Sequence, residues 1–136
     1  RALGIEPEER FGAYEGAPIG WAGPVGEDRE ELRARMEEVL EGPVRLIPGG
    51  RARVDRVGIV TGGGASFIGA AAEAGLDGLV TGEGSHHSYV EAMELGVNVF
   101  YGGHYATETF GVRALADRLA ERFDLEATFL DFPTGL

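Results

Sequence analysis

The sequence contains no cysteine, no lysine and no long apolar run. Without cysteine the chain can form neither a disulfide nor a thiolate zinc site, so a bound metal would need imidazole, carboxylate or water ligands. That ligand set favours zinc, iron, manganese or magnesium. No apolar stretch approaches the roughly 20 residues that span a bilayer, and the first residues lack a secretory-signal pattern. These absences predict a cytoplasmic protein that does not enter a membrane.

Positive charge is also scarce, because all twelve basic residues are arginine and the formal net charge is −11. Nucleic-acid backbones are bound by basic surfaces that displace counterions, so this balance argues against a nucleic-acid partner. The 136 residues, with 43% hydrophobic content, suffice for one core. We therefore predict a single folded region over residues 1–136. Since the chain begins with Arg1 and not Met, we expect it to be a fragment of a longer polypeptide.

From residue 54 onward, apolar strand-like segments, small-residue loops and helix-like segments follow one another three times. Such βα units are typical of α/β folds with parallel strands. We predict a layered α/β sandwich with a mostly parallel or mixed sheet, in which residues 1–53 form a connecting helix and strands. The expected strands cover residues 19–22, 44–47, 57–60, 78–80, 97–101 and 127–130, and the expected helices end at Leu40, Ala74, Leu95 and about Arg122.

Two of these helices carry specific signals. Asp28, followed three residues later by Glu31, predicts a capping box at the start of the first helix. The last helix is expected to bury one face through apolar residues at helical spacing. That face comprises Val112, Leu115, Ala116, Leu119 and Phe123.

All the histidines lie in loops that follow the expected parallel strands. The loops at residues 61–66, 82–87 and 102–108 would leave the carboxyl ends of three strands and gather along one edge of the sheet. That edge carries His86, His87, His104, Glu83 and Glu108. A histidine and carboxylate edge without thiols fits a hydrolytic or Lewis-acid metal site better than a structural zinc site.

His104 and Glu108 are the candidate metal ligands at this edge. They are four residues apart at an expected helix start, so both side chains share one helix face and could hold one cation. The alternative is a solvated helix face. His86 and His87 are adjacent, so at most one would point toward a shared metal; alternatively Ser85 caps the helix and both rings lie at the surface or bind carboxylates.

The glycines at 62–64 allow two interpretations. Their backbone N–H groups could cradle a phosphate before the following helix, although the P-loop lysine and spacing are absent. Alternatively they form a tight strand-to-helix turn. A phosphate-binding module that uses this loop, with His104 and Glu108 only structural, is a third functional hypothesis besides those below.

The segments VGIVTGGG, TGEGSHH, GGHYATE and TFLDFPTGL resemble the Nif-three-like dinuclear metal centre family, whose members are described as GTP cyclohydrolase I type 2 homologues. The resemblance covers residues 54–136 well, and the opening, from RALGIEP to the expected strand PIGWAG, looks like the middle of such proteins. It implies that His104 and Glu108 are metal ligands of the carboxyl-terminal half. The family's other ligands, an adjacent histidine pair and an acidic residue, belong to an amino-terminal half without a counterpart here, and His86-His87 is not that pair.

The resemblance further implies two facing α/β lobes, of which this chain is one and part of the other, two divalent ions per complete site and a homohexamer. The first hypothesis is a metal-dependent hydrolase acting on a nucleotide-like small molecule, with Glu83 or His87 as a proton carrier. The alternative is a non-catalytic metal-binding oligomer with a regulatory or scaffold role. Metal-dependent turnover separates the two.

Overall fold

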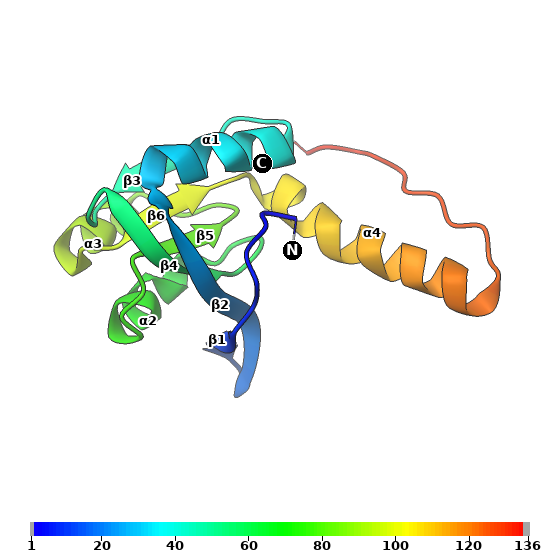
Figure 1. Ribbon diagram of the computed structural model, residues 1–136, viewed down its shortest axis with the longest axis horizontal. Helices are drawn as coiled ribbons and strands as arrows, with labels where there is room; N and C mark the ends of the chain where they lie inside the picture. The colour runs from blue at the N-terminus through cyan, green and yellow to red at the C-terminus, as the bar shows by residue number, and fades with distance from the viewer. Residues whose placement is uncertain (1, 135–136) are drawn as a thin grey trace.

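The computed structural model describes residues 2–134, which form one mixed six-stranded sheet with helices against it (Figure 1). The strand order is β1-β2-β4-β5-β6-β3. The central neighbours β4, β5 and β6 are parallel, whereas β1, β2 and β3 pair antiparallel. The fold class predicted from the sequence is therefore confirmed. The strands are β1 (Glu9–Tyr14), β2 (Ala17–Asp28), β3 (Arg45–Pro48), β4 (Arg53–Ile59), β5 (Gly78–Thr81) and β6 (Asn98–Tyr101).

The helices follow the expected order. They are α1 (Arg29–Leu40), a short 3-10 turn η1 (Ala65–Phe67) leading into α2 (Ile68–Glu73), α3 (His87–Leu95) and α4 (His104–Phe123). The capping box at the start of α1 is present as predicted, with the Asp28 carboxylate accepting from the backbone of the first turn and Glu31 returning to the Asp28 N–H. None of the helices in residues 2–134 is long and apolar enough to span a membrane.

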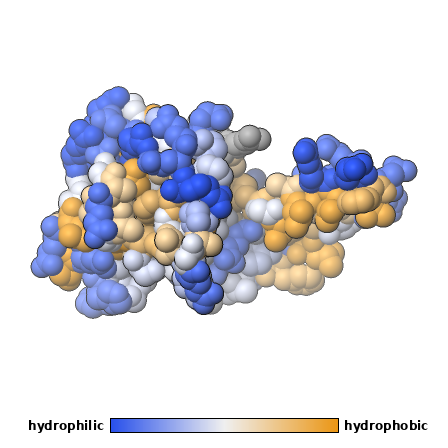
Figure 2. Space-filling model, turned by 90° about the horizontal axis from the view of Figure 1, so that it is seen from below, coloured by the Kyte–Doolittle hydropathy of each residue, from blue (hydrophilic) through white to orange (hydrophobic). Residues whose placement is uncertain are grey.

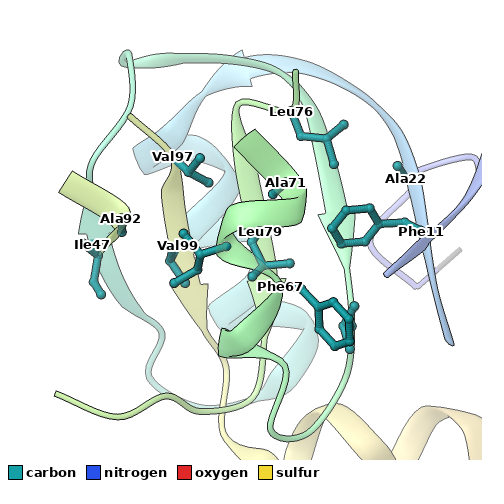
Figure 3. Close-up of a cluster of buried hydrophobic side chains, with 12 residues drawn as sticks. Phe11, Ala22, Ile47, Phe67, Ala71, Leu76, Leu79, Ala92, Val97 and Val99 are labelled. Carbon is teal, nitrogen blue, oxygen red and sulfur yellow. The ribbon is translucent and has the colours of Figure 1, made fainter. Parts of the chain in front are cut away.

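Alternation along the strands divides the core into two layers. Leu79 and Val99 face α2 and α3, and their neighbours Val80 and Phe100 face α1, because successive strand residues point to opposite sides. Figure 3 shows the first layer, in which Phe11 from β1 also packs near Phe67. Buried layers on both faces hold the three parallel strands firmly, and their carboxyl ends carry the site described below.

The amino-terminal strands differ from the prediction. The expected strand at residues 19–22 is part of β2, which continues through the Gly23-Pro24 signal with an irregular register between Pro24 and Glu27. A bulge accommodates proline there because proline cannot donate to the ladder. The preceding strand β1 was not predicted. It joins β2 through Glu15 and Gly16, which both have positive φ.

Helix α4 departs most from the prediction. It extends away from the sheet, and the chain after it returns toward α1 (Figure 1). Its expected buried face is wrong, because the large apolar side chains are exposed and only Thr107 of this helix is buried. Figure 2 shows the apolar surface along this projecting helix. The expected strand at residues 127–130 is also wrong, since no ladder partner pairs with it in the described part of the chain. The exposed apolar side chains of α4 that were expected to be buried are Val112, Leu115, Leu119 and Phe123.

Candidate metal centre

Three loops meet at the carboxyl ends of β4, β5 and β6, as the sequence predicts. Their backbones are joined directly: Gly82 N–H donates to the carbonyl oxygen of Gly62 at 2.8 Å, and Gly103 N–H donates to that of Gly82 at 2.9 Å. Glycine permits this approach, because a Cβ at Gly82 would lie 2.7 Å from the Gly62 oxygen and from the His104 Cα. The edge of the sheet is thus one hydrogen-bonded unit.

Two buried threonines, which sequence reasoning did not single out, fix the glycine loop within this unit. Thr107 Oγ1 accepts from Gly62 N–H at 3.0 Å and donates back to the first turn of α4. Thr81 Oγ1 donates to the Gly62 carbonyl at 3.0 Å and accepts from Gly64 N–H at 2.9 Å. The N–H groups of Gly62 and Gly64 are therefore used internally, which supports the tight-turn interpretation of residues 62–64. Threonine at the end of a strand is too common to mark such a role in a sequence.

His104 is the first residue of α4, and Glu108 lies one turn further along. The His104 Nε2 atom is 3.4 Å from Glu108 Oε2, and the His104 Nδ1 atom is 2.8 Å from Glu83 Oε1. The three side chains are partly open to solvent, between 38% and 54% exposed. The structure thus brings together three of the predicted residues in one line, from Glu83 through His104 to Glu108.

This arrangement fits a metal ligand pair. An Nδ1–H that donates to the Glu83 carboxylate places the lone pair of the neutral ring on Nε2, the atom that faces Glu108. A carboxylate behind the ring fixes its tautomer and raises its basicity, as is common for metal-bound histidine. The imidazole nitrogen and carboxylate oxygen are donors that zinc, iron or manganese accept.

Gly62 closes the other side of the pair. It has a φ of +69°, and a Cβ at this position would lie 2.4 Å from Glu108 Oε1 and 3.0 Å from His104 Nε2. No side chain can occupy that space without displacing one of the two candidate ligands. The role of this glycine is therefore to leave room beside them.

The acidic neighbours change the titration of His104. The hydrogen bond that the His104 ring donates to Glu83, together with the negative charges of Glu108 and Glu83, raises the pKa of His104 above its usual value, although partial loss of solvation acts to lower it. A more basic ring is a better donor to a cation, and it also holds a competing proton more tightly.

The adjacent histidines do not join the pair. His87 is hydrogen-bonded to the Ser85 hydroxyl through its ring, at 3.0 Å from Nδ1, and His86 is exposed. Ser85 is not the helix cap, because α3 begins after His86 without a capping side chain. Across residues 2–134 no group of three or more histidine, aspartate or glutamate side chains is arranged to hold a metal. The pair offers two candidate ligands.

The fold and this pair define a mixed-sheet α/β protein with candidate metal ligands at the carboxyl edge of its parallel strands. Residues 1–134 match the model of the Duf34/NIF3 (NGG1p interacting factor 3) family. The chain belongs to this family. The resemblance noted in the sequence motifs is therefore confirmed.

Similar proteins agree with this assignment. The chain is 41% identical over 138 residues to a GTP cyclohydrolase 1 type 2 homolog of Archaeoglobus fulgidus, and 42% identical over 139 residues to one of Deinococcus radiodurans. All of this chain is covered in both cases, with 54% and 52% of those relatives. A solved structure of the protein ybgI, of unknown function, matches with a TM-score of 0.89 and 35% identity, over 98% of this chain and 53% of that one. The chain thus spans about half the length of the proteins it matches.

Proposed function

We propose that this chain contributes His104 and Glu108 to a dinuclear divalent-metal centre of a metal-dependent hydrolase that acts on a nucleotide-like substrate. The observation that carries the proposal is the alignment of Glu83, His104 and Glu108. Glu83 holds the ring at Nδ1, so that Nε2 is directed toward the second candidate ligand. The name of the similar proteins, GTP cyclohydrolase 1 type 2 homolog, supports a nucleotide-like substrate.

In this proposal each residue of the chain has a distinct task. His104 and Glu108 bind zinc, iron, manganese or magnesium, and Glu83 orients the His104 ring. Gly62 leaves the space beside the ligands free. The bound ions would supply Lewis-acid polarisation of the substrate and activation of water. Glu83 is a positioning residue here, because its hydrogen bond acts through His104.

The complete centre needs more than these two ligands. The resemblance to the family implies two ions per site, and the chain spans about half of its relatives. We propose that the remaining ligands come from polypeptide other than residues 2–134, and that the assembled protein is a homohexamer. This chain alone would then bind a cation weakly, whereas the assembled protein would bind it tightly.

Metal stoichiometry tests the proposal first. The assembled protein, after dialysis with metal and then against metal-free buffer, is measured by elemental mass spectrometry beside His104→Ala and Glu108→Ala. We expect bound metal in the parent and its loss in both variants. Glu38→Ala is the matched control, since Glu38 is an exposed acid on α1 far along the chain from the site. Equal metal content in all four proteins would contradict a metal centre at His104 and Glu108.

Turnover separates the hydrolase from the non-catalytic alternative. GTP is incubated with the metal-loaded protein and the products are separated by chromatography. Metal-dependent product formation that disappears in His104→Ala supports the hydrolase. Tight, His104-dependent metal without any product would instead support a metal-binding regulatory or scaffold protein.

A further inference from the structure

An open hollow of about 500 Å³ lies directly beside the candidate metal centre. It is lined by residues of the loop before α3, by Gly103 at the start of α4, and by the facing ends of β3 and β6. Glu83 belongs both to this lining and to the hydrogen bond with His104. Its volume falls in the range of small-molecule sites, about 300–1,000 Å³. A ligand in this hollow would adjoin Glu83, the residue that is hydrogen-bonded to the His104 ring.

Arg45 lies at this edge because β3 runs antiparallel to β6. The pairing places Arg45 opposite Tyr101, so the first residue of β3 meets the carboxyl end of β6. Ile47, two residues further along β3, packs in the core layer beneath α2 and α3, and Tyr101 packs against the same layer. Since alternate strand residues share a face, the Arg45 side chain lies on this side of the sheet as well.

The guanidinium of Arg45 has no carboxylate partner in the described part of the chain. By contrast, both arginines of β4 are paired, Arg53 with Asp55 at 3.1 Å and Arg56 with Glu9 at 2.6 Å. The chain has 23 acidic residues and only twelve arginines, so partners are plentiful. An exposed, unpaired guanidinium at a hollow offers a two-pronged donor to a phosphate or carboxylate.

Tyr101, the register partner of Arg45, gives the hollow a hydrogen-bond acceptor. Ser88 Oγ donates to the carbonyl oxygen of Ser85, so the Tyr101 hydroxyl donates to Ser88 Oγ, at 2.7 Å. The oxygen of Tyr101, which lines the hollow, can still accept a hydrogen bond. Gly84 lies against this hydroxyl, since a Cβ there would be 2.3 Å from it. The hollow thus has a cationic donor and a hydrogen-bond acceptor on two neighbouring strands.

We propose that Arg45 binds the phosphate of a nucleotide-like substrate in this hollow and so places the substrate's remaining part beside His104. This inference rests on the proposed function for the kind of substrate. The site takes an anionic group at Arg45 and a hydrogen-bond donor, such as an N–H or a sugar hydroxyl, at Tyr101. Arg45 is a substrate-binding residue. It is the one arginine among the described residues that line the hollow.

Isothermal titration calorimetry of metal-free protein with GMP and with guanosine tests the inference. The parent is expected to bind GMP about tenfold more tightly than guanosine, because a charge-assisted hydrogen bond to phosphate contributes about that factor. Arg45→Gln should weaken GMP binding about tenfold and leave guanosine unchanged. Arg45→Lys should retain part of the preference, since lysine keeps the charge and loses the fork.

Arg118→Gln is the matched control, because Arg118 is an exposed arginine on the projecting part of α4. It removes the same charge and should leave both affinities unchanged. An equal effect of Arg45→Gln and Arg118→Gln on GMP, equal affinity of the parent for GMP and guanosine, or no binding of either would overturn the inference.

Because the titrations are done without metal, the two proposals fail separately. If GMP binding depends on Arg45 but no metal depends on His104, the phosphate site is supported and the metal-dependent hydrolase is contradicted. If turnover depends on metal but Arg45→Gln leaves the affinity for GMP unchanged, only the phosphate site is contradicted.

Discussion

At the scale of single residues, Glu83 decides how His104 behaves. The Glu83 hydrogen bond is the main reason that the pKa of His104 is raised. We expect Glu83→Gln to lower the pKa of His104 and to weaken metal binding about tenfold. NMR titration of the metal-free protein measures the pKa. Glu94→Gln, an exposed glutamate on α3, is the control and should change neither quantity. An unchanged titration of His104 in Glu83→Gln would refute the positioning role.

Metal binding should itself depend on pH through the same residue. The raised pKa of His104 means that its ring stays protonated to a higher pH than an ordinary histidine, and a protonated ring cannot bind a metal. We expect metal affinity to be full above the raised pKa and to fall progressively as the pH drops through it. Affinity measured against a chelator from pH 5 to 8 checks this, and a flat profile would count against His104 as a ligand.

Gly62 and Gly63 offer a matched pair of substitutions beside the ligands. A Cβ added at Gly62 would lie 2.4 Å from Glu108 Oε1, and the backbone there has a positive φ. A Cβ added at Gly63 has no contact nearer than 3.9 Å. Gly62→Ala should therefore reduce bound metal strongly and cost about 1–2 kcal/mol of stability, while Gly63→Ala should be close to neutral. Elemental analysis and thermal unfolding measure both, and similar losses in the two variants would contradict the steric account.

At the scale of elements, Asp77 secures the end of the sheet opposite the site. Its carboxylate accepts from the backbone N–H groups of Asp55 and Arg56 and from Arg51. Burial acts to raise the pKa of Asp77, but the hydrogen bonds from Arg51 and the two backbone groups outweigh it and lower the pKa. This carboxylate therefore stabilises the fold above the usual pKa of aspartate, and the contribution is lost as the pH falls through the lower folded-state value.

Replacing Asp77 should show that dependence. We expect Asp77→Asn to lower the free energy of unfolding by about 1–3 kcal/mol at pH 7 and by less in acid. Urea unfolding at pH 7 and pH 3 measures the difference. Asp117→Asn, at an exposed position of α4, is the control. A constant difference between the two pH values would mean that the charge of Asp77 does not matter.

Local signals explain which elements could be predicted. Asp28 and Glu31 alone mark the first turn of α1, and apolar runs between glycine-rich loops mark the three parallel strands. Both features could therefore be predicted from the sequence. The hairpin of β1 and β2 could not, because its turn at Glu15 and Gly16 lacks the Asn-Gly or Asp-Gly signal that usually marks one.

The site shows the same division. Helical spacing indicated His104 and Glu108, since it depends only on positions one turn apart. The contacts of Glu83, Thr81 and Thr107 depend on how separate loops meet, which spacing along the chain does not encode.

At the scale of the whole molecule, the projecting helix α4 exposes large apolar side chains in a row. Leu115 is 59% exposed and Phe123 is 61% exposed, and a contiguous apolar surface of this kind favours association. We expect the 136-residue chain to self-associate in solution, and Leu115→Glu combined with Leu119→Glu to reduce that association. Sedimentation velocity measures both, with Arg118→Glu as a control on the same helix. A monomeric parent chain at high concentration would contradict the expectation.

The backbone hydrogen bonds that join Gly62, Gly82 and Gly103 have a consequence for how this protein can vary. These bonds connect main-chain atoms, so exchanges of neighbouring side chains leave them intact as long as the glycines remain. Adding or removing one residue in any of the three loops would shift the donor away from its acceptor. Among homologous sequences, the lengths of these loops should therefore be more strictly preserved than the identities of the residues between the glycines.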